Sequence, residues 1–137
     1  MNWENKTPKP SDIIRTKVKF YYHYGIFISE DEVIQFGLPD DPGRPAEEIK
    51  VISTDIYTFL MGGEIEVAKP DSEERKKMRN TADIIKTARD KIGEGGYDIL
   101  HNNCEHFVNN CVFGESNSSF VDSVREKIRA KLKKNKN

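Results

Sequence analysis

Cys104 is the residue whose type and setting best suit covalent chemistry, and it lies in the stretch Asn102-Asn103-Cys104-Glu105-His106-Phe107-Val108. Asn103 is a good helix N-cap, so the pattern predicts that Cys104 begins a helix and that Gly114 ends it. A thiol there faces the positive end of the helix dipole and unbonded backbone N–H groups, which both favour the nucleophilic thiolate. The same N–H groups would hold the oxyanion of an acyl-transfer intermediate.

A cysteine nucleophile needs an imidazole to accept its proton. His101 and His106 lie within three residues of Cys104, and such close neighbours at a helix start tend to point elsewhere. His23 lies far away in the sequence, within the aromatic and β-branched residues 20–28. Such a run favours a strand, which would hold the imidazole rigidly. His23 is therefore the candidate general base.

Two motifs of this chain together resemble the lecithin:retinol acyltransferase-like family, whose relatives include the NlpC-type cysteine peptidases. They are His23-Tyr24-Gly25-Ile26-Phe27-Ile28 and Asn103-Cys104-Glu105-His106-Phe107-Val108. The resemblance covers roughly residues 17–114. It implies an α+β fold of the circularly permuted papain-like type, with an antiparallel sheet packed against helices, one of which starts at the catalytic Cys. By this resemblance Cys104 is the nucleophile and His23 the general base.

The family usually has a second histidine about a dozen residues after the first, and this chain has Gln35 there. A glutamine carbonyl can accept the imidazole N–H and fix its tautomer, but it carries no charge. We therefore expect Gln35 to be the third catalytic residue and to support a weakened activity. Tyr24 and Asn103 are the candidate substrate-binding residues.

The activity implied by the resemblance is thiol acyl transfer or hydrolysis through an acyl-thioester on Cys104, with lipid ester donors such as phospholipids. One alternative is an NlpC-type amidase or peptidase, and another is a binding module that has lost turnover. No cofactor is expected. His101, Cys104, His106 and Cys111 superficially suggest a metal site, but Cys104 and His106 are two positions apart and would point to nearly opposite sides of a helix.

The elements that must position these residues begin with a strand over residues 17–28. Alternation places Phe20 and Tyr24 on its core face and His23 on the other face. A returning strand over residues 33–37 would bring Gln35 back toward His23. Further predicted elements are a strand at 49–52, a brief helix capped by Ser53 or Thr54, a strand at 64–68, a helix at 71–79 and a helix capped by Asn80.

A length of 137 residues predicts one catalytic domain, which we place at residues 13–114 after a flexible lead-in at residues 1–12. The formal net charge of −1 argues against general binding of nucleic acids. We expect no signal peptide and no membrane-spanning segment. Cys104 and Cys111 lie too far apart on one helix for a disulfide, which favours a reducing compartment and hence a cytoplasmic protein.

Residues 115–137 are predicted to form a linker and a basic amphipathic helix. Residues 120–137 contain seven Lys or Arg against two Asp or Glu. Apolar residues recur there at roughly helical spacing, at Phe120, Val121, Val124, Ile128 and Leu132. One interpretation is a helix that lies on an anionic membrane surface. The other is a solvated terminal helix that its few apolar residues dock onto the domain.

Overall fold

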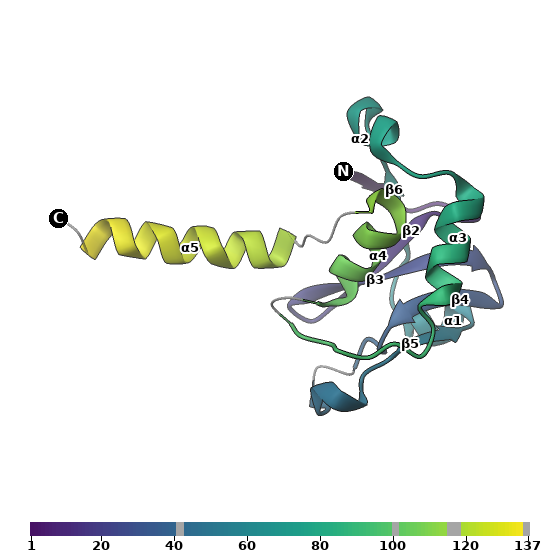
Figure 1. Ribbon diagram of the computed structural model, residues 1–137, viewed down its shortest axis with the longest axis horizontal. Helices are drawn as coiled ribbons and strands as arrows, with labels where there is room; N and C mark the ends of the chain where they lie inside the picture. The colour runs from purple at the N-terminus through teal and green to yellow at the C-terminus, as the bar shows by residue number, and fades with distance from the viewer. Residues whose placement is uncertain (41–42, 100–101, 115–118, 136–137) are drawn as a thin grey trace.

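Six antiparallel strands form one sheet in the computed structural model, which describes residues 1–40, 43–99, 102–114 and 119–135 (Figure 1). The strand order is β1-β6-β2-β3-β4-β5, and the two hairpins β2-β3 and β3-β4 form its centre. The strands are β1 (Asn2–Glu4), β2 (Ile13–Val18), β3 (Tyr21–Ser29), β4 (Glu32–Phe36), β5 (Val51–Thr54) and β6 (Glu66–Lys69). This arrangement is the predicted α+β class with an antiparallel sheet.

Helices pack on both faces of the sheet. The helical elements are η2 (Ala46–Glu48), α1 (Ile56–Leu60), α2 (Ser72–Lys77), α3 (Thr81–Asp90), α4 (Cys104–Phe113) and α5 (Ser119–Asn135). Helices α3 and α4 cover one face, where they bury Ile84 and Val108 against the strands. Helix α1 covers the other face, where Phe59 is fully buried. The strands that carry His23 and Gln35 therefore lie between two hydrophobic cores.

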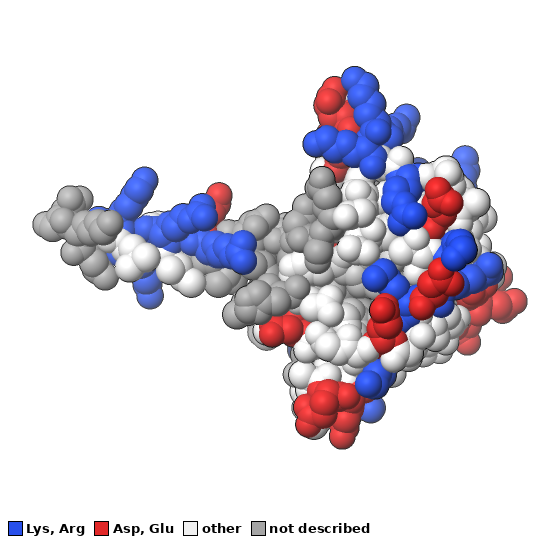
Figure 2. All heavy atoms as spheres, in the orientation of Figure 1, with Lys and Arg blue, Asp and Glu red and all other residues white. Residues whose placement is uncertain are grey.

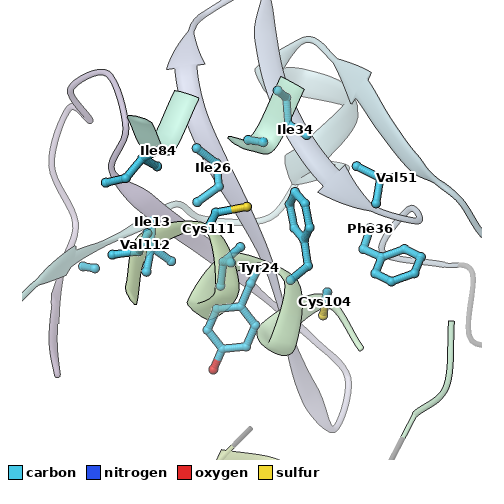
Figure 3. Close-up of a cluster of buried hydrophobic side chains, with 14 of the residues drawn as sticks. Ile13, Tyr24, Ile26, Ile34, Phe36, Val51, Ile84, Cys104, Cys111 and Val112 are labelled. Atoms are coloured by element: carbon cyan, nitrogen blue, oxygen red, sulfur yellow. The ribbon is translucent and has the colours of Figure 1, made fainter. Parts of the chain in front are cut away.

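Strand β3 contributes to both of these cores. Tyr24 and Ile26 point toward α3 and α4, and Figure 3 shows them with Cys104 and Cys111 in that core. Phe27 packs with the α1 core, and Gly25 lies directly beneath Phe59. The prediction of a single core face on this strand is therefore wrong, because α1 buries the second face too.

Residues 1–12 differ from the predicted flexible lead-in, because residues 2–4 form the edge strand β1. This strand pairs with β6, with Trp3 opposite Ala68. The Trp3 ring also packs 5.8 Å from the Tyr24 ring, and the Arg15 guanidinium lies 4.0 Å over Trp3. Long-range pairing and aromatic packing thus order a segment whose local composition is that of a loop.

The predicted strand over residues 17–28 is interrupted by a tight turn at Lys19 and Phe20. Val18 pairs with Tyr21 across this turn. Phe20, predicted to be in the core, is 97% exposed at its tip. Alternation alone could not reveal the turn, because the residues on both sides of it have strand-forming side chains.

Helix starts follow the local capping signals closely. Asn80 caps α3 and Asn103 caps α4, as predicted, and α4 ends at Gly114, whose φ of 72° is the left-handed conformation that glycine favours. The brief helix α1 is capped by Asp55, one residue after the predicted Thr54. The side chain of Thr54 instead contacts Gln35.

Helix α5 extends away from the domain (Figure 1). Its residues Ile128 and Leu132 remain largely exposed, so they do not dock onto the sheet or the other helices. None of the helices within residues 1–40, 43–99, 102–114 and 119–135 is long and apolar enough to cross a membrane.

Replacement of Gly25 by alanine is expected to destabilise the fold. An added Cβ would lie 2.7 Å from Cε2 of Phe59 and 3.2 Å from Cγ1 of Val33, so these packed side chains would have to move. Such overpacking costs about 1–3 kcal/mol of unfolding free energy. Urea unfolding of Gly25→Ala measures this loss. Gly43→Ala is the matched control because no atom lies within 4 Å of its added Cβ. Equal stability of Gly25→Ala and wild type would contradict the packing described.

Candidate active site

A reciprocal capping box defines the start of α4. The Asn103 side chain accepts hydrogen bonds from the backbone N–H groups of Glu105 (2.9 Å) and His106 (3.1 Å). In return, the backbone N–H of Asn103 donates to Nδ1 of His106 at 2.9 Å. These bonds satisfy N–H groups that a helix start otherwise leaves without partners, and they fix the first helical position, which Cys104 occupies.

Asn103 is buried, and both ends of its side chain bind the main chain. Besides its capping bonds, its Nδ2 donates to the carbonyl oxygen of Ile99 at 2.9 Å. Asn103 thereby ties the preceding loop to the helix that carries Cys104. These contacts support a positioning role, and the predicted contact with substrate stays a prediction.

The thiol of Cys104 lies against β3. Its Sγ–H donates to the carbonyl oxygen of Tyr22 over 4.0 Å, and Tyr22 directly precedes His23. Burial raises the pKa of the thiol from 9.0 to about 11, although the backbone N–H of Tyr24 lowers it. The expected preference for thiolate is therefore wrong for this state, because desolvation outweighs the N–H groups at the helix start.

His23 and Gln35 are in direct contact. Nε2 of His23 lies 2.7 Å from Oε1 of Gln35, and both side chains are almost completely buried. The contact arises because β3 and β4 are paired with Gly25 opposite Gln35, which places His23 beside the end of β4. The hairpin predicted from the sequence thus brings these two residues together.

A chain of hydrogen bonds fixes which nitrogen of His23 carries the proton. The Thr54 hydroxyl donates to the carbonyl oxygen of Asp55 (3.0 Å), so it accepts from Nε2 of Gln35 (2.7 Å). The oxygen of the Gln35 amide then faces His23 and must accept from Nε2–H. Neutral His23 consequently has its lone pair on Nδ1, the nitrogen able to take a proton from a thiol.

Phe59 of α1 covers the imidazole of His23. The two rings lie 5.3 Å apart between centroids and are tilted by 36°. Gly25 leaves the space that Phe59 occupies. The ring of Phe59 therefore shields the His23–Gln35 hydrogen bond from competing water.

Thr54 and Phe59 are site residues that the sequence did not identify. Thr54 reaches Gln35 because β5 pairs with β4, with Val33 opposite Thr54. Phe59 reaches His23 because α1 folds over the sheet. Both contacts join segments that are distant in the sequence. For Phe59 the local sequence, an apolar residue in a short helix, predicts that the side chain is buried but does not predict which residue it covers.

A pocket of about 250 Å³ lies on the α4 face of the sheet. Its lining includes Tyr24 and Glu105, which are sequence neighbours of His23 and Cys104, but not His23, Gln35 or Cys104 themselves. Tyr24 is one of its lining residues, and its predicted contact with substrate stays a prediction. Burial together with the nearby Glu105 carboxylate raises the pKa of Tyr24 to about 12. The phenol is therefore neutral over the physiological range. The other lining residues are Met1, Trp3, Ile13, Arg15, Glu74, Glu105, Val108, Asn109 and Phe113, a mixture of apolar and charged groups.

The remaining candidates for chemistry lie apart from this arrangement. Cys111 is a free thiol in the hydrophobic core, and burial raises its pKa to about 12. His101 lies outside the described residues. Within the part of the chain that the structure describes, no three His, Cys, Asp or Glu side chains group closely enough to hold a metal ion.

Comparison with known proteins identifies close sequence relationships. The family model described as lecithin retinol acyltransferase matches residues 6–117. The chain is 28% identical to a lecithin retinol acyltransferase of Bos taurus over 138 residues, which cover 86% of this chain and 60% of the bovine protein. It is 26% identical to phospholipase A and acyltransferase 3 of Homo sapiens over 132 residues, which cover 90% of this chain and 80% of the human protein. The chain thus spans about 60% of the length of the bovine relative.

Alkylation of Cys104 by iodoacetamide is expected to accelerate with pH up to about pH 11. A raised pKa means that the thiolate is gained only as the pH approaches that value, so under about 1% is ionised at pH 8.5. Digestion with a protease that cleaves after glutamate separates the two cysteines at Glu105, and mass spectrometry of the resulting peptides then gives a separate rate for each. In urea the peptide that contains Cys104 should show a midpoint near the free value of about 8.5. A plateau of the native rate below pH 8.5 would contradict the raised pKa.

Proposed function

Because the chain belongs to the lecithin retinol acyltransferase family, we propose that it is a cysteine-dependent acyltransferase or hydrolase acting on lipid esters such as phospholipids. Its relatives are named as acyltransferases and phospholipases, which supports an enzyme of lipid chemistry. The observation that carries the proposal is the contact of the Cys104 thiol with the carbonyl oxygen of Tyr22, the residue that directly precedes His23 on β3. The Gln35 amide holds that imidazole in the tautomer that a general base requires.

The first chemical step in this proposal is attack of the Cys104 sulfur on the ester carbonyl carbon. Since burial holds the thiol protonated, the proton passes to Nδ1 of His23 as the bond to carbon forms. The backbone N–H of Cys104, which is not among the N–H groups that the Asn103 side chain caps, helps to stabilise the oxyanion. His23 then returns its proton to the departing alcohol, which leaves an acyl-thioester on Cys104.

The second step resolves the thioester. Water or an acceptor hydroxyl or amine attacks the thioester carbonyl while His23 removes its proton. The sulfur leaves and regains a proton from His23, which restores the resting thiol. Hydrolysis follows if water is the acceptor, and acyl transfer follows if an alcohol or amine is.

Gln35 orients the base without adding charge. Its oxygen stabilises the His23 imidazolium by one hydrogen bond, and Thr54 keeps the amide from rotating. A second imidazole at this position, or a carboxylate, would stabilise the cation more strongly. The geometry therefore supports catalysis with a smaller contribution from the third residue, and not a module that has lost the site.

The order of the elements supports the circularly permuted papain-like fold proposed for this chain. The strand with His23 precedes the helix with Cys104, and α4 packs on the sheet that contains that strand. The proposed catalytic unit, residues 13–114, lies entirely within the matched residues 6–117.

A second candidate function is an amidase or peptidase that uses the same Cys104 and His23. The charged groups in the pocket beside Tyr24, namely Arg15, Glu74 and Glu105, favour it because they suit a polar substrate better than an acyl chain. The apolar wall of Trp3 and Val108 favours the lipid substrate. The two functions share the acyl-thioester and differ in the donor that forms it.

Helix α5 is proposed to bind an anionic membrane surface. Ile128 and Leu132 are one turn apart and more than half exposed. Figure 2 shows basic side chains along the same helix. Such a helix lies in the membrane interface, with its apolar residues buried and its cations near lipid phosphates. Exposure of these residues argues against the docked terminal helix, the other interpretation of the sequence.

The acyl-enzyme is expected to appear as a mass gain of one acyl group after incubation with a donor. A short-chain phosphatidylcholine and an activated amide or peptide panel serve as donors, and intact-protein mass spectrometry detects the adduct. Cys104→Ala should abolish the adduct. His23→Ala should slow its formation by a factor of about 10² to 10⁴, because the general base is lost.

Gln35 variants test the third residue in the same assay. Gln35→Leu removes the acceptor for Nε2–H and should slow the reaction, whereas Gln35→His should preserve or increase its rate. Formation of an adduct only with amides would favour the peptidase. Wild type with no adduct and no product on any donor would instead support a binding module.

Ile128→Ser combined with Leu132→Ser is expected to weaken vesicle binding about ten-fold or more, since burial of both side chains is lost. Co-sedimentation with phosphatidylcholine vesicles that contain about one-quarter phosphatidylserine measures it. Ile92→Ser, a change of an exposed isoleucine on the domain, is the matched control. Wild-type binding should fall with added salt. Wild-type vesicle binding that changes neither with salt concentration nor with the content of anionic lipid would contradict the proposal.

A further inference from the structure

The β2-β3 turn presents a bare aromatic ring close to the candidate nucleophile. Phe20 is 97% exposed, an unusual state for a large apolar side chain, and it precedes the Cys104 contact at Tyr22 by only two residues. Two residues of chain span at most about 7 Å. The turn therefore holds an exposed apolar ring at its tip, near the thiol.

The backbone holds this tip in a defined position. The turn has two residues, and Lys19 adopts the left-handed conformation with φ of 48°, which residues other than glycine rarely do. The hydroxyl of Tyr21 donates to the carbonyl oxygen of Pro39, which ties the base of the hairpin to the next loop. Phe20 thus projects from a rigid hairpin.

The surroundings of the tip are basic and apolar. Lys17 and Lys19 are both exposed, and residues 17–24 contain no acidic side chain. Ile99 is a second exposed apolar residue near the thiol, with 52% of its surface accessible. Its carbonyl oxygen binds the side chain of Asn103, the residue before Cys104. Apolar side chains therefore lie near the thiol in both segments that lead to it.

We infer that the β2-β3 turn inserts Phe20 into a phospholipid surface and so brings the Cys104 thiol to the level of the lipid ester groups. A single convex ring offers roughly 200 Å² of contact, far below the ~1,000 Å² that a specific protein interface buries. A membrane interface has no fixed shape to match, so a single aromatic ring can insert at any point of it. Lysines beside the ring can pair with the lipid phosphates. The usual depth of such insertion, about 5–10 Å, is of the same order as the length of chain from Phe20 to Tyr22, at most about 7 Å.

The role of this surface in catalysis rests on the acyl-transfer function proposed above, whereas the insertion itself does not require turnover. It also differs from binding through α5, which depends on anionic lipid. Vesicles of pure phosphatidylcholine isolate the contribution of Phe20, because they weaken the electrostatic attraction of the basic helix.

Full-length Phe20→Ser is expected to bind phosphatidylcholine vesicles about ten-fold more weakly than wild type in co-sedimentation. Phe20→Trp should bind as wild type does, and its fluorescence emission should shift to shorter wavelength on vesicles. Tyr57→Ser, which removes an exposed aromatic ring from α1, is the matched control and should bind as wild type does.

Measurements of activity on vesicles and on monomeric lipid distinguish membrane insertion of Phe20 from a structural role of this residue. Phe20→Ser should lose about ten-fold in activity on vesicles but retain wild-type activity on monomeric short-chain phosphatidylcholine. Equal vesicle binding of Phe20→Ser and wild type, or an unshifted emission of Phe20→Trp, would overturn the inference. Sedimentation velocity that shows a dimer lost in Phe20→Ser would assign the tip to a second copy and overturn it too. If wild type turned over no donor, the binding and emission results would still decide on insertion, and only the proposed function would fail.

Discussion

Burial of the start of α4 against β3 is the constraint on which the rest of the site depends. A helix start carries unbonded N–H groups, so it can be buried only if they find partners. Asn103 and His106 supply those partners from the side chains of the helix itself. The thiol of Cys104 can then lie in the core beside β3, at the cost of a raised pKa. The same burial that positions the proposed nucleophile therefore also raises its pKa.

The second half of the site is organised by neutral groups. His23, Gln35 and Thr54 form a directional chain that ends on a main-chain carbonyl, and neither Gln35 nor Thr54 can carry a charge. Such a chain fixes a tautomer as well as a carboxylate does but stabilises an imidazolium less. Phe59 over the ring lowers the local dielectric, which strengthens these hydrogen bonds. Compared with a carboxylate partner, this chain orients the His23 imidazole equally well but stabilises its protonated form less.

Sequence reasoning succeeded where the signals are local and failed where distant segments meet. The start and end of α4 follow from Asn103 and Gly114, and the meeting of His23 with Gln35 follows from a hairpin. Strand β1 forms only because β6, more than sixty residues away, supplies its partner. The direction of the Cys104 pKa depends on how deeply the folded domain buries the thiol. The effect of a helix start on the thiol pKa can be predicted from neighbouring residues, whereas the effect of desolvation depends on the whole fold.

The pairing of β1 with β6 also bears on the order of folding. The central hairpins close over short loops, but β1 can add to the sheet only after β6 has joined β2, since its partner strand does not exist before then. Closing so long a loop is entropically costly, so β1 belongs among the last elements to form. Trp3, the single tryptophan of the chain, lies in this strand and packs beside Arg15 and Tyr24. Its fluorescence therefore follows completion of the sheet, and collapse of the two cores could precede any change that it records.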